Sequence, residues 1–217
     1  MVDNNQNADY VLKYIIVGDA AVGKSNICYR FIKGKFKEQY QATLGMDFAY
    51  KNLKVGNNNY RIQIWDTAGQ ECFQSISRGY YKSSVCGLIV YDITDRNSFN
   101  NIANWVEQCK NNGPSTLSLI LVGNKTDLEE KRDITYEEGL NIAERFNMKF
   151  YETSAFNGNN INNLFTESLE NIIKKIDNGD YDLTTSDCGI TANSIRISDI
   201  YKENNSKNKN KKKKRFC

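Results

Sequence analysis

The sequence predicts an α/β fold: a mostly parallel six-stranded sheet with one antiparallel strand and helices on both faces. Short apolar runs alternate along the chain with stretches whose apolar residues recur at helical spacing, the order that builds parallel strands through helical crossovers. The runs at residues 85–93 and 117–123 are continuously apolar, as strands buried on both faces are. A turn at residues 56–59 joins two alternating segments and predicts a hairpin, which supplies the antiparallel strand.

The individual elements follow from the same patterns. Strands are expected at residues 10–18, 47–55, 60–66, 85–93, 117–123 and 149–153. Helices are expected at residues 24–32, 136–146 and 160–176, and apolar residues at helical spacing between positions 102 and 109 indicate another. Because ligands of such sheets bind at the carboxyl ends of the strands, functional residues are expected directly after them.

The composition indicates one globular domain with a polar extension at each end. The chain of 217 residues is 40% hydrophobic and 25% charged, which is ordinary for a globular protein. We expect a short polar extension at residues 1–9, a folded domain at residues 10–178 and a disordered tail at residues 179–217, which is rich in Asn, Ser, Thr, Asp and Lys. We expect no signal peptide, and the apolar runs are too short to span a bilayer.

Residue usage excludes several function classes. The chain has no His, so a Cys/His metal site and a His-based catalytic triad are excluded, and its six scattered cysteines are expected to be reduced thiols. Residues 202–217 carry eight Lys or Arg and one Glu, whereas the rest of the chain carries 21 basic and 25 acidic side chains. The body is therefore mildly acidic, and we expect no nucleic-acid partner.

A Gly-rich string between the first predicted strand and the first predicted helix has the pattern G-x-x-x-x-G-K-[ST]. Its residues, with Asn26 after them, are Gly18, Asp19, Ala20, Ala21, Val22, Gly23, Lys24 and Ser25. The backbone N–H groups of such a loop surround phosphates, Lys24 reaches the β- and γ-phosphates, and the Ser25 hydroxyl binds Mg²⁺. The string predicts the P-loop NTPase fold, but ATPases share it, so it does not identify the base.

A second string, Asn124-Lys125-Thr126-Asp127, follows the strand at residues 117–123 and bears on the base. A carboxylate at Asp127 can accept hydrogen bonds from both the ring N–H and the exocyclic amine of guanine. Adenine lacks that amine and presents an acceptor at the ring nitrogen, so this carboxylate would reject it. Asn124 and Lys125 would shape the pocket. On its own, the string is equally consistent with an ordinary strand-to-helix turn.

Two further strings end predicted strands. At the end of the third strand, Asp66 can hold Mg²⁺ through water, Gly69 permits close approach to the γ-phosphate, and Gln70 can orient the attacking water. After the last strand, the Ser154-Ala155 pair could bring the backbone N–H of Ala155 to the guanine oxygen.

These four strings, in this order and each at a strand end, resemble the Ras superfamily of small GTPases over roughly residues 8–176. The resemblance implies that Thr43 ligates Mg²⁺ and contacts the γ-phosphate, and that Phe36 lies against the guanine face. Four strings, at residues 44–48, 61–65, 80–82 and 88–94, are most similar to the Rab family. Phe156 departs from the family, which usually has Lys there.

The resemblance implies a GTP-binding and GTP-hydrolysing switch in vesicle trafficking, with bound GDP or GTP and Mg²⁺. We expect slow intrinsic hydrolysis, partners that comprise an exchange factor, a GTPase-activating protein and effectors, and a monomer. A non-hydrolysing GTP-bound scaffold and an ATP-using P-loop kinase are the alternatives; the presence of Ser25, Thr43 and Gln70 argues against the first.

The tail predicts a membrane anchor. A basic run at residues 211–215 precedes Cys217, and the resemblance to Rabs implies a geranylgeranyl group on that cysteine. A lipid together with a basic patch is the usual minimum for anchoring to an anionic surface. We therefore expect the protein on the cytoplasmic face of an intracellular membrane, cycling with the cytosol. One alternative is a solvated basic tail with an incidental cysteine, since Rabs usually carry two. A nuclear-localisation signal in the Lys run is a second alternative, which the Rab-like body disfavours.

Overall fold

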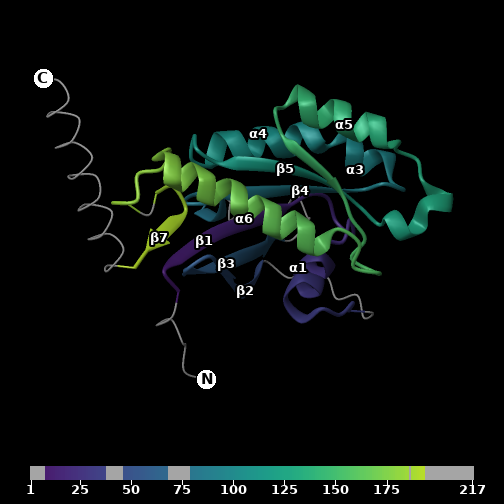
Figure 1. The fold of residues 1–217 in the computed structure, drawn as a ribbon. Coiled ribbons are helices and arrows are strands. Elements are labelled where there is room, and N and C mark those ends of the chain that lie inside the picture. Colours follow the sequence, from purple (N-terminus) through teal and green to yellow (C-terminus); the bar gives the residue numbers. More distant parts are fainter. Residues whose placement is uncertain (1–7, 38–45, 68–78, 186, 194–217) are drawn as a thin grey trace, which may run out of the picture.

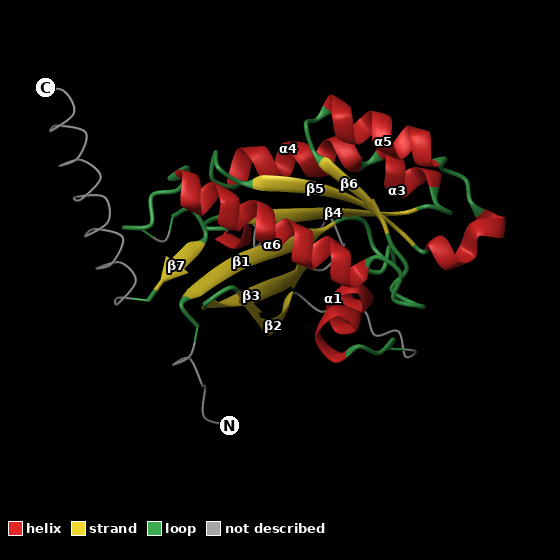
Figure 2. Cartoon of the chain, viewed as in Figure 1, coloured by secondary structure: helices red, strands yellow, loops and turns green. Residues whose placement is uncertain are grey.

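The computed structural model describes residues 8–37, 46–67, 79–185 and 187–193, and structural statements below refer to these residues. Its centre is a twisted sheet in which six strands follow the order β2-β3-β1-β4-β5-β6 (Figure 2). Their bounds are β1 Tyr10–Val17, β2 Met46–Val55, β3 Asn58–Thr67, β4 Cys86–Asp92, β5 Ser118–Asn124 and β6 Lys149–Glu152. Only β2 runs antiparallel to its neighbour in this path, so the predicted sheet is confirmed.

Helices cover both faces of the sheet (Figure 1). They are α1 Lys24–Lys33, α3 Arg96–Asn100, α4 Ile102–Asn112, α5 Tyr136–Arg145 and α6 Ile161–Asn178, with a 3₁₀ helix, η3, at Thr126–Lys131. Along β1, Leu12, Tyr14 and Ile16 pack with α1 and α6, whereas Ile15 and Val17 pack with α4 and α5. This alternation, with both sides apolar, is what a strand between two helical layers requires.

Local sequence explains where several elements begin and end. The α5 helix starts with a capping box, in which Thr135 accepts from the Glu138 N–H and the Glu138 carboxylate accepts from the Thr135 N–H. The β2–β3 hairpin turns at Gly56 and Asn57, and Val55 pairs with Asn58. The third strand therefore starts two residues earlier than predicted, which shortens the turn to the two-residue kind.

A seventh strand, β7 at Ile190–Ala192, corrects one expectation. The tail was expected to be disordered from residue 179, but residues 187–193 return to the sheet, and β7 pairs antiparallel with β1. The β4 strand pairs with β1 only from Tyr14 onward, which leaves the edge beside Tyr10–Leu12 for β7. Four apolar side chains between the end of α6 and residue 193 are buried: Tyr181, Cys188, Ile190 and Ala192. The folded domain thus extends to residue 193.

In the part of the chain that the structure describes, none of the helices combines the length and apolar character needed to cross a bilayer.

Candidate nucleotide-binding site

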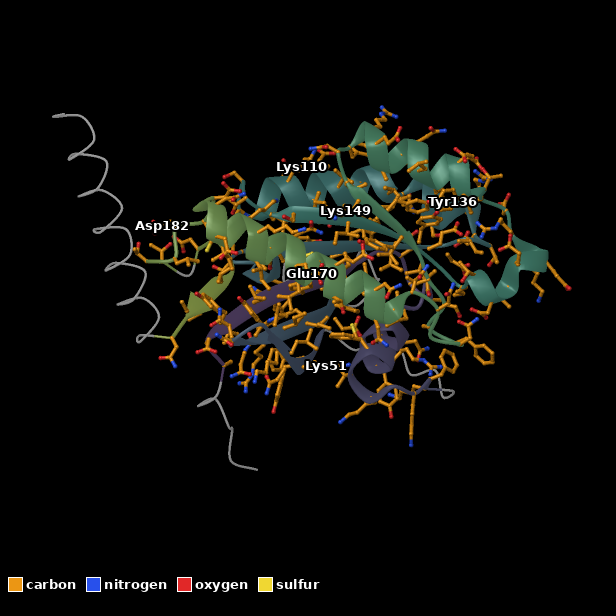
Figure 3. All side chains as sticks on the ribbon, in the orientation of Figure 1. Lys51, Lys110, Tyr136, Lys149, Glu170 and Asp182 are labelled. Atoms are coloured by element: carbon orange, nitrogen blue, oxygen red, sulfur yellow. The ribbon has the colours of Figure 1, made fainter. Side chains whose placement is uncertain are left out.

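The predicted functional strings gather at one end of the molecule, where the parallel strands have their carboxyl ends. The Gly-rich loop joins β1 to α1, Asp66 lies near the end of β3, and the segments from Asn124 and from Thr153 follow β5 and β6. In Figure 3, Tyr136 marks the side of the molecule toward which these strands run, and Asp182, in the returning tail, marks the opposite side. This is the position in which open α/β sheets bind their ligands.

Two glycines fix the shape of the Gly-rich loop. Gly18 has φ +140°, and a Cβ there would stand 2.1 Å from the Val90 carbonyl oxygen of β4. Gly23, at the start of α1, has φ +98°, and a Cβ would stand 2.3 Å from Nδ2 of Asn124. Both positions combine a left-handed backbone with a close neighbour, so a side chain at either would distort the loop.

Lys24 places a cation inside this loop. Its ammonium is buried and donates to the carbonyl oxygens of Gly18 and Asp19, at 2.7 Å each. Burial lowers the pKa of Lys24 to about 8, against the opposing influence of the nearby Asp66 and Asp19 carboxylates. A buried cation at a helix N-terminus is stabilised by an anion, and phosphate oxygens are the anions that such a loop accommodates.

The Asp19 side chain is held by Trp105 of α4 and by Asn101, the residue directly before that helix. Its carboxylate accepts from Nε1 of Trp105 and from Nδ2 of Asn101, at 2.7 Å each. Sequence reasoning placed Asp19 in the loop but missed both partners. Trp105 is one of the apolar residues whose helical spacing indicated only a packing helix, and no local signal assigns Asn101 to the loop.

Asn124 connects three of the four strings. It is buried at the end of β5, and its Nδ2 donates to the Val22 carbonyl of the Gly-rich loop at 2.9 Å. Its Oδ1 accepts from the Thr153 hydroxyl and from the Ala155 N–H, both at 3.2 Å. One side chain therefore sets the separation between the loop expected at the phosphates and the loop expected at the base.

Asp127 and Lys125 belong to the same string as Asn124 and contact different segments. The Asp127 carboxylate is exposed, and Oδ1 accepts from the Ser154 hydroxyl at 2.5 Å. Lys125 has φ +71°, and its ammonium lies 2.6 Å from Oδ2 of Asp92, the last residue of β4. Asp92 was missed, although its place at the carboxyl end of a predicted strand was a usable signal.

Asp66 and Ser25 have the chemistry that Mg²⁺ requires. Asp66 is a buried carboxylate near the end of β3, close enough to Lys24 to influence its pKa, and Ser25 directly follows Lys24. The next residue of β3, Thr67, ties this strand to β1 by donating its hydroxyl to the Ile16 carbonyl at 2.8 Å. A carboxylate and a hydroxyl are hard oxygen ligands, so the described residues fit Mg²⁺. Three predicted residues of the nucleotide site, Thr43, Gly69 and Gln70, lie outside the described residues, as does the predicted lipidation residue Cys217.

Phe36 lies beyond the end of α1, near the loop after β6. Its ring meets Phe156 edge to face, with centroids 5.2 Å apart and planes at 78°. Asn26, early in α1, accepts from the Lys37 N–H at 3.2 Å through Oδ1. Asn26 thus holds the segment that carries Phe36 against α1. Of the predicted site residues in this loop and helix, Ala20, Ala21 and Ser25 are exposed, and Val22 is buried.

The fold and this cluster define a P-loop nucleotide-binding protein. Residues 13–174 match the Ras family. The chain is 40% identical to the Ras-related protein Rab-2B of Dictyostelium discoideum over 169 residues, 78% of this chain and 84% of that protein. It is 45% identical to Rab-11B of the same organism over 161 residues, 72% and 73% of the two chains. Against human Rab-4B the identity is 37% over 182 residues, 84% and 85% of the two chains.

The chain therefore belongs to the Ras family of small GTPases and is Rab-like. It is a GTP-hydrolysing enzyme, and this membership implies a GTP-dependent switch in vesicle trafficking. The family also implies a bound guanine nucleotide with Mg²⁺, and Rabs generally act with exchange factors, activating proteins and effectors. The ATP-using alternative does not hold for a member of this family.

Proposed function

We propose that the residues gathered at the carboxyl end of the sheet form the guanine-nucleotide site through which this chain switches. The observation that carries the proposal is Asn124, whose amide joins the Val22 carbonyl at 2.9 Å and the Ala155 N–H at 3.2 Å. A buried side chain with three polar partners holds two loops at a fixed separation. That separation would correspond to the distance between the phosphates and the base of one nucleotide.

At the phosphate side, Lys24 would exchange its two loop carbonyls for phosphate oxygens. The loop N–H groups from Ala20 to Ser25 and the N-terminus of α1 would donate to the same anion. Ser25, Thr43 and Asp66 would hold Mg²⁺, which when bound neutralises charge on the β- and γ-phosphates. The support for this assignment is the burial of Lys24 and its 2.7 Å contacts to the Gly18 and Asp19 carbonyl oxygens, because those groups line the loop from inside.

At the base side, Asp127 would accept from the ring N–H and the amine of guanine, and the Ala155 N–H would donate to its carbonyl oxygen. Ser154 supports this role because its hydroxyl fixes Oδ1 of Asp127 at 2.5 Å. Lys125, held by Asp92 at 2.6 Å, would lie along the base. Phe36 would cover the face of the base.

Hydrolysis would use Gln70 to orient the attacking water, while Thr43 and Gly69 would contact the γ-phosphate and make the switch segments depend on it. Effectors would then bind the GTP form. No Arg is an obvious finger in this chain, so we expect turnover on the order of 10⁻⁴ s⁻¹ until an activating protein supplies one.

The base assignment is tested by Asp127→Asn, with binding of GDP and of xanthosine diphosphate measured side by side. Xanthine has a carbonyl where guanine has its amine, so the amide of the variant can donate where the carboxylate accepted. We expect GDP affinity to fall and xanthosine diphosphate affinity to rise. Asp133→Asn, in the loop before α5, is the matched control and should leave both unchanged. Unaltered GDP affinity in Asp127→Asn contradicts the assignment.

We also propose that the tail holds the domain on a membrane through a lipid on Cys217 and the basic run before it. Each basic side chain near an anionic leaflet contributes about 1 kcal/mol, and one lipid chain alone anchors only marginally. The protein would then cycle between the cytosol and the cytoplasmic face of an intracellular membrane, as a monomer. The test is mass spectrometry of the C-terminal peptide with fractionation of wild type and Cys217→Ser. An unmodified cysteine with equal partition of the two proteins refutes the lipid anchor.

A further inference from the structure

Arg30, in the last turn of α1, binds backbone oxygens of two different loops. Its Nη1 donates to the Gly34 carbonyl at 3.0 Å, just past the end of its own helix. Its Nε donates to the Ala155 carbonyl at 2.8 Å, and its Nη2 donates to the Phe156 carbonyl. The first contact is an ordinary helix C-terminal interaction. The other two reach across the molecule to the loop after β6.

The two loops that Arg30 joins also touch through their aromatic rings. Gly34 leads into Phe36, whose ring meets Phe156 edge to face with centroids 5.2 Å apart. Gly158 closes the same loop and lies against the Arg30 side chain, since a Cβ there would stand 3.6 Å from Cδ of Arg30. The guanidinium and the two rings therefore form one connection between the segment after α1 and the segment after β6.

We propose that Arg30 is a positioning residue for base recognition, an inference that rests on the proposed guanine site. The Ala155 N–H is the donor assigned to the guanine carbonyl oxygen, and it lies 3.2 Å from Oδ1 of Asn124. Arg30 fixes the carbonyls of Ala155 and of the next residue. The Ala155 N–H and C=O lie on the two planar peptide units that meet at its Cα, so holding the carbonyl fixes the unit after Cα and leaves only the φ and ψ rotations of Ala155 to move the N–H. Asn124 and Arg30 thus hold Ala155 from its two sides.

The planar guanidinium suits this task, and an ammonium does not. Arg presents five N–H donors in a fixed fork, so one side chain can serve three carbonyls in two loops. A Lys at the same position keeps the charge, but its single nitrogen cannot span the same carbonyls. The conservative substitution therefore separates the geometry of the fork from its charge.

The test compares Arg30→Ala and Arg30→Lys with wild type, using GDP and 6-thio-GDP in the presence of Mg²⁺. The thio analogue keeps the donors that face Asp127 and replaces the carbonyl oxygen by sulfur, a weaker acceptor. If Arg30 acts through the Ala155 N–H, both variants lose about tenfold in GDP affinity, the value of roughly one good hydrogen bond, and about threefold or less in 6-thio-GDP affinity. Arg96→Ala is the matched control, because Arg96 also binds a loop carbonyl, that of Asp133, and an acidic side chain.

The outcomes distinguish a role of Arg30 in base recognition from a role in fold stability alone. Equal losses for both nucleotides in the Arg30 variants, with thermal stability lowered as in Arg96→Ala, mean that Arg30 only stabilises the fold, and they overturn the inference. GDP affinity within about twofold of wild type in Arg30→Lys overturns the requirement for the fork. If wild type itself binds no GDP, the proposed site fails rather than the role of Arg30. Arg30→Lys keeps the long side chain and its charge, so it keeps the test decisive should Arg30→Ala not fold.

Discussion

The two ends of strand β1 are built in different ways. At the carboxyl end, polar side chains hold loops by binding backbone groups: Asn124 binds the Val22 carbonyl, and Lys24 binds the carbonyls of Gly18 and Asp19. At the amino end, β7 pairs with β1 through the backbone, and apolar side chains of the returning tail fill the space beside it. The first end is held together by polar contacts to loop backbone groups, and the second is a continuation of the core.

This difference predicts that substitutions at the two ends of β1 change different properties of the protein. Because the carboxyl-end loops are held by directional contacts to the same groups that would bind nucleotide, changes there should alter nucleotide handling more than stability. Because β7 contributes a backbone ladder and burial, changes there should alter stability and leave nucleotide handling intact. Glycines with a left-handed backbone occur at both ends and allow a direct comparison.

The largest effect is expected for Gly23→Ala. The new Cβ would stand 2.3 Å from Nδ2 of Asn124, so the Asn124–Val22 contact must break or the loop must move. We expect GDP affinity to fall about 100-fold, since backbone strain and a lost buried hydrogen bond act together. Equilibrium binding of a fluorescent GDP analogue measures this. The control is Gly56→Ala, which has φ +58° and nothing within 4 Å, and it should bind GDP as wild type does.

The next effect, at the other end, is expected for Gly189→Ala. Gly189 has φ +80°, and its Cβ would stand 2.3 Å from the Val85 N and 2.4 Å from the Ser84 carbonyl carbon. We expect about 2 kcal/mol lower stability and faster amide exchange at Lys13, whose N–H donates to the Gly189 carbonyl at 2.9 Å.

Denaturant unfolding and hydrogen exchange check this second prediction. Gly179→Ala is the control, because it has the same φ of +80° with nothing within 4 Å. GDP affinity should stay unchanged in both variants. A loss of GDP affinity in Gly189→Ala alone would show that the two ends are coupled and would break the comparison.

The same contrast explains what the sequence could predict. The site strings consist of polar and glycine residues in fixed spacing after apolar strands, so their chemistry and their common edge could be inferred before any coordinates. Asn101 and Arg30 could not, because their partners lie 82 and 125 positions away in the sequence. Nothing local marks such a pair.

The strand β7 was missed for a physical reason. It has three residues, and within it Ile190 and Ala192 are separated by the exposed Thr191 in a segment dominated by polar residues. Periodicity needs a longer window than this, and composition favoured disorder. The segment pairs with the edge of β1 at Tyr10–Leu12, which β4 leaves to it because β4 pairs with β1 only from Tyr14 onward, and no local pattern in the tail shows this.

A smaller effect is expected for Gln70→Leu, at the carboxyl end. If Gln70 orients the attacking water, the variant should keep its nucleotide affinity and hydrolyse GTP at about one tenth of the wild-type rate or below. The water is then no longer positioned, while the contacts that bind the nucleotide are kept. Single-turnover phosphate release measures the rate. Gln63→Leu, on strand β3, is the control and should hydrolyse at the wild-type rate. Equal rates for wild type and Gln70→Leu would place the water-orienting group elsewhere.

The smallest effect is a proton taken up by Lys24. Burial lowers its pKa to about 8 in the free protein, and a polyphosphate beside the ammonium must raise that pKa again. At a pH near 8 the free protein has lost part of this proton, so nucleotide binding is accompanied by proton uptake. Nucleotide affinity therefore falls as the pH rises further. Calorimetry of GDP binding in two buffers of different ionisation enthalpy should give an uptake of about half a proton near that pH, and a markedly smaller uptake from Lys24 at lower pH.

Lys13 offers the control from the other end of the comparison. Burial also lowers its pKa, but its ammonium donates to the Lys82 carbonyl at 2.7 Å, so Lys13→Gln should leave the uptake unchanged. An uptake that disappears in Lys13→Gln would assign the proton to the amino end and contradict the role of Lys24 at the phosphates.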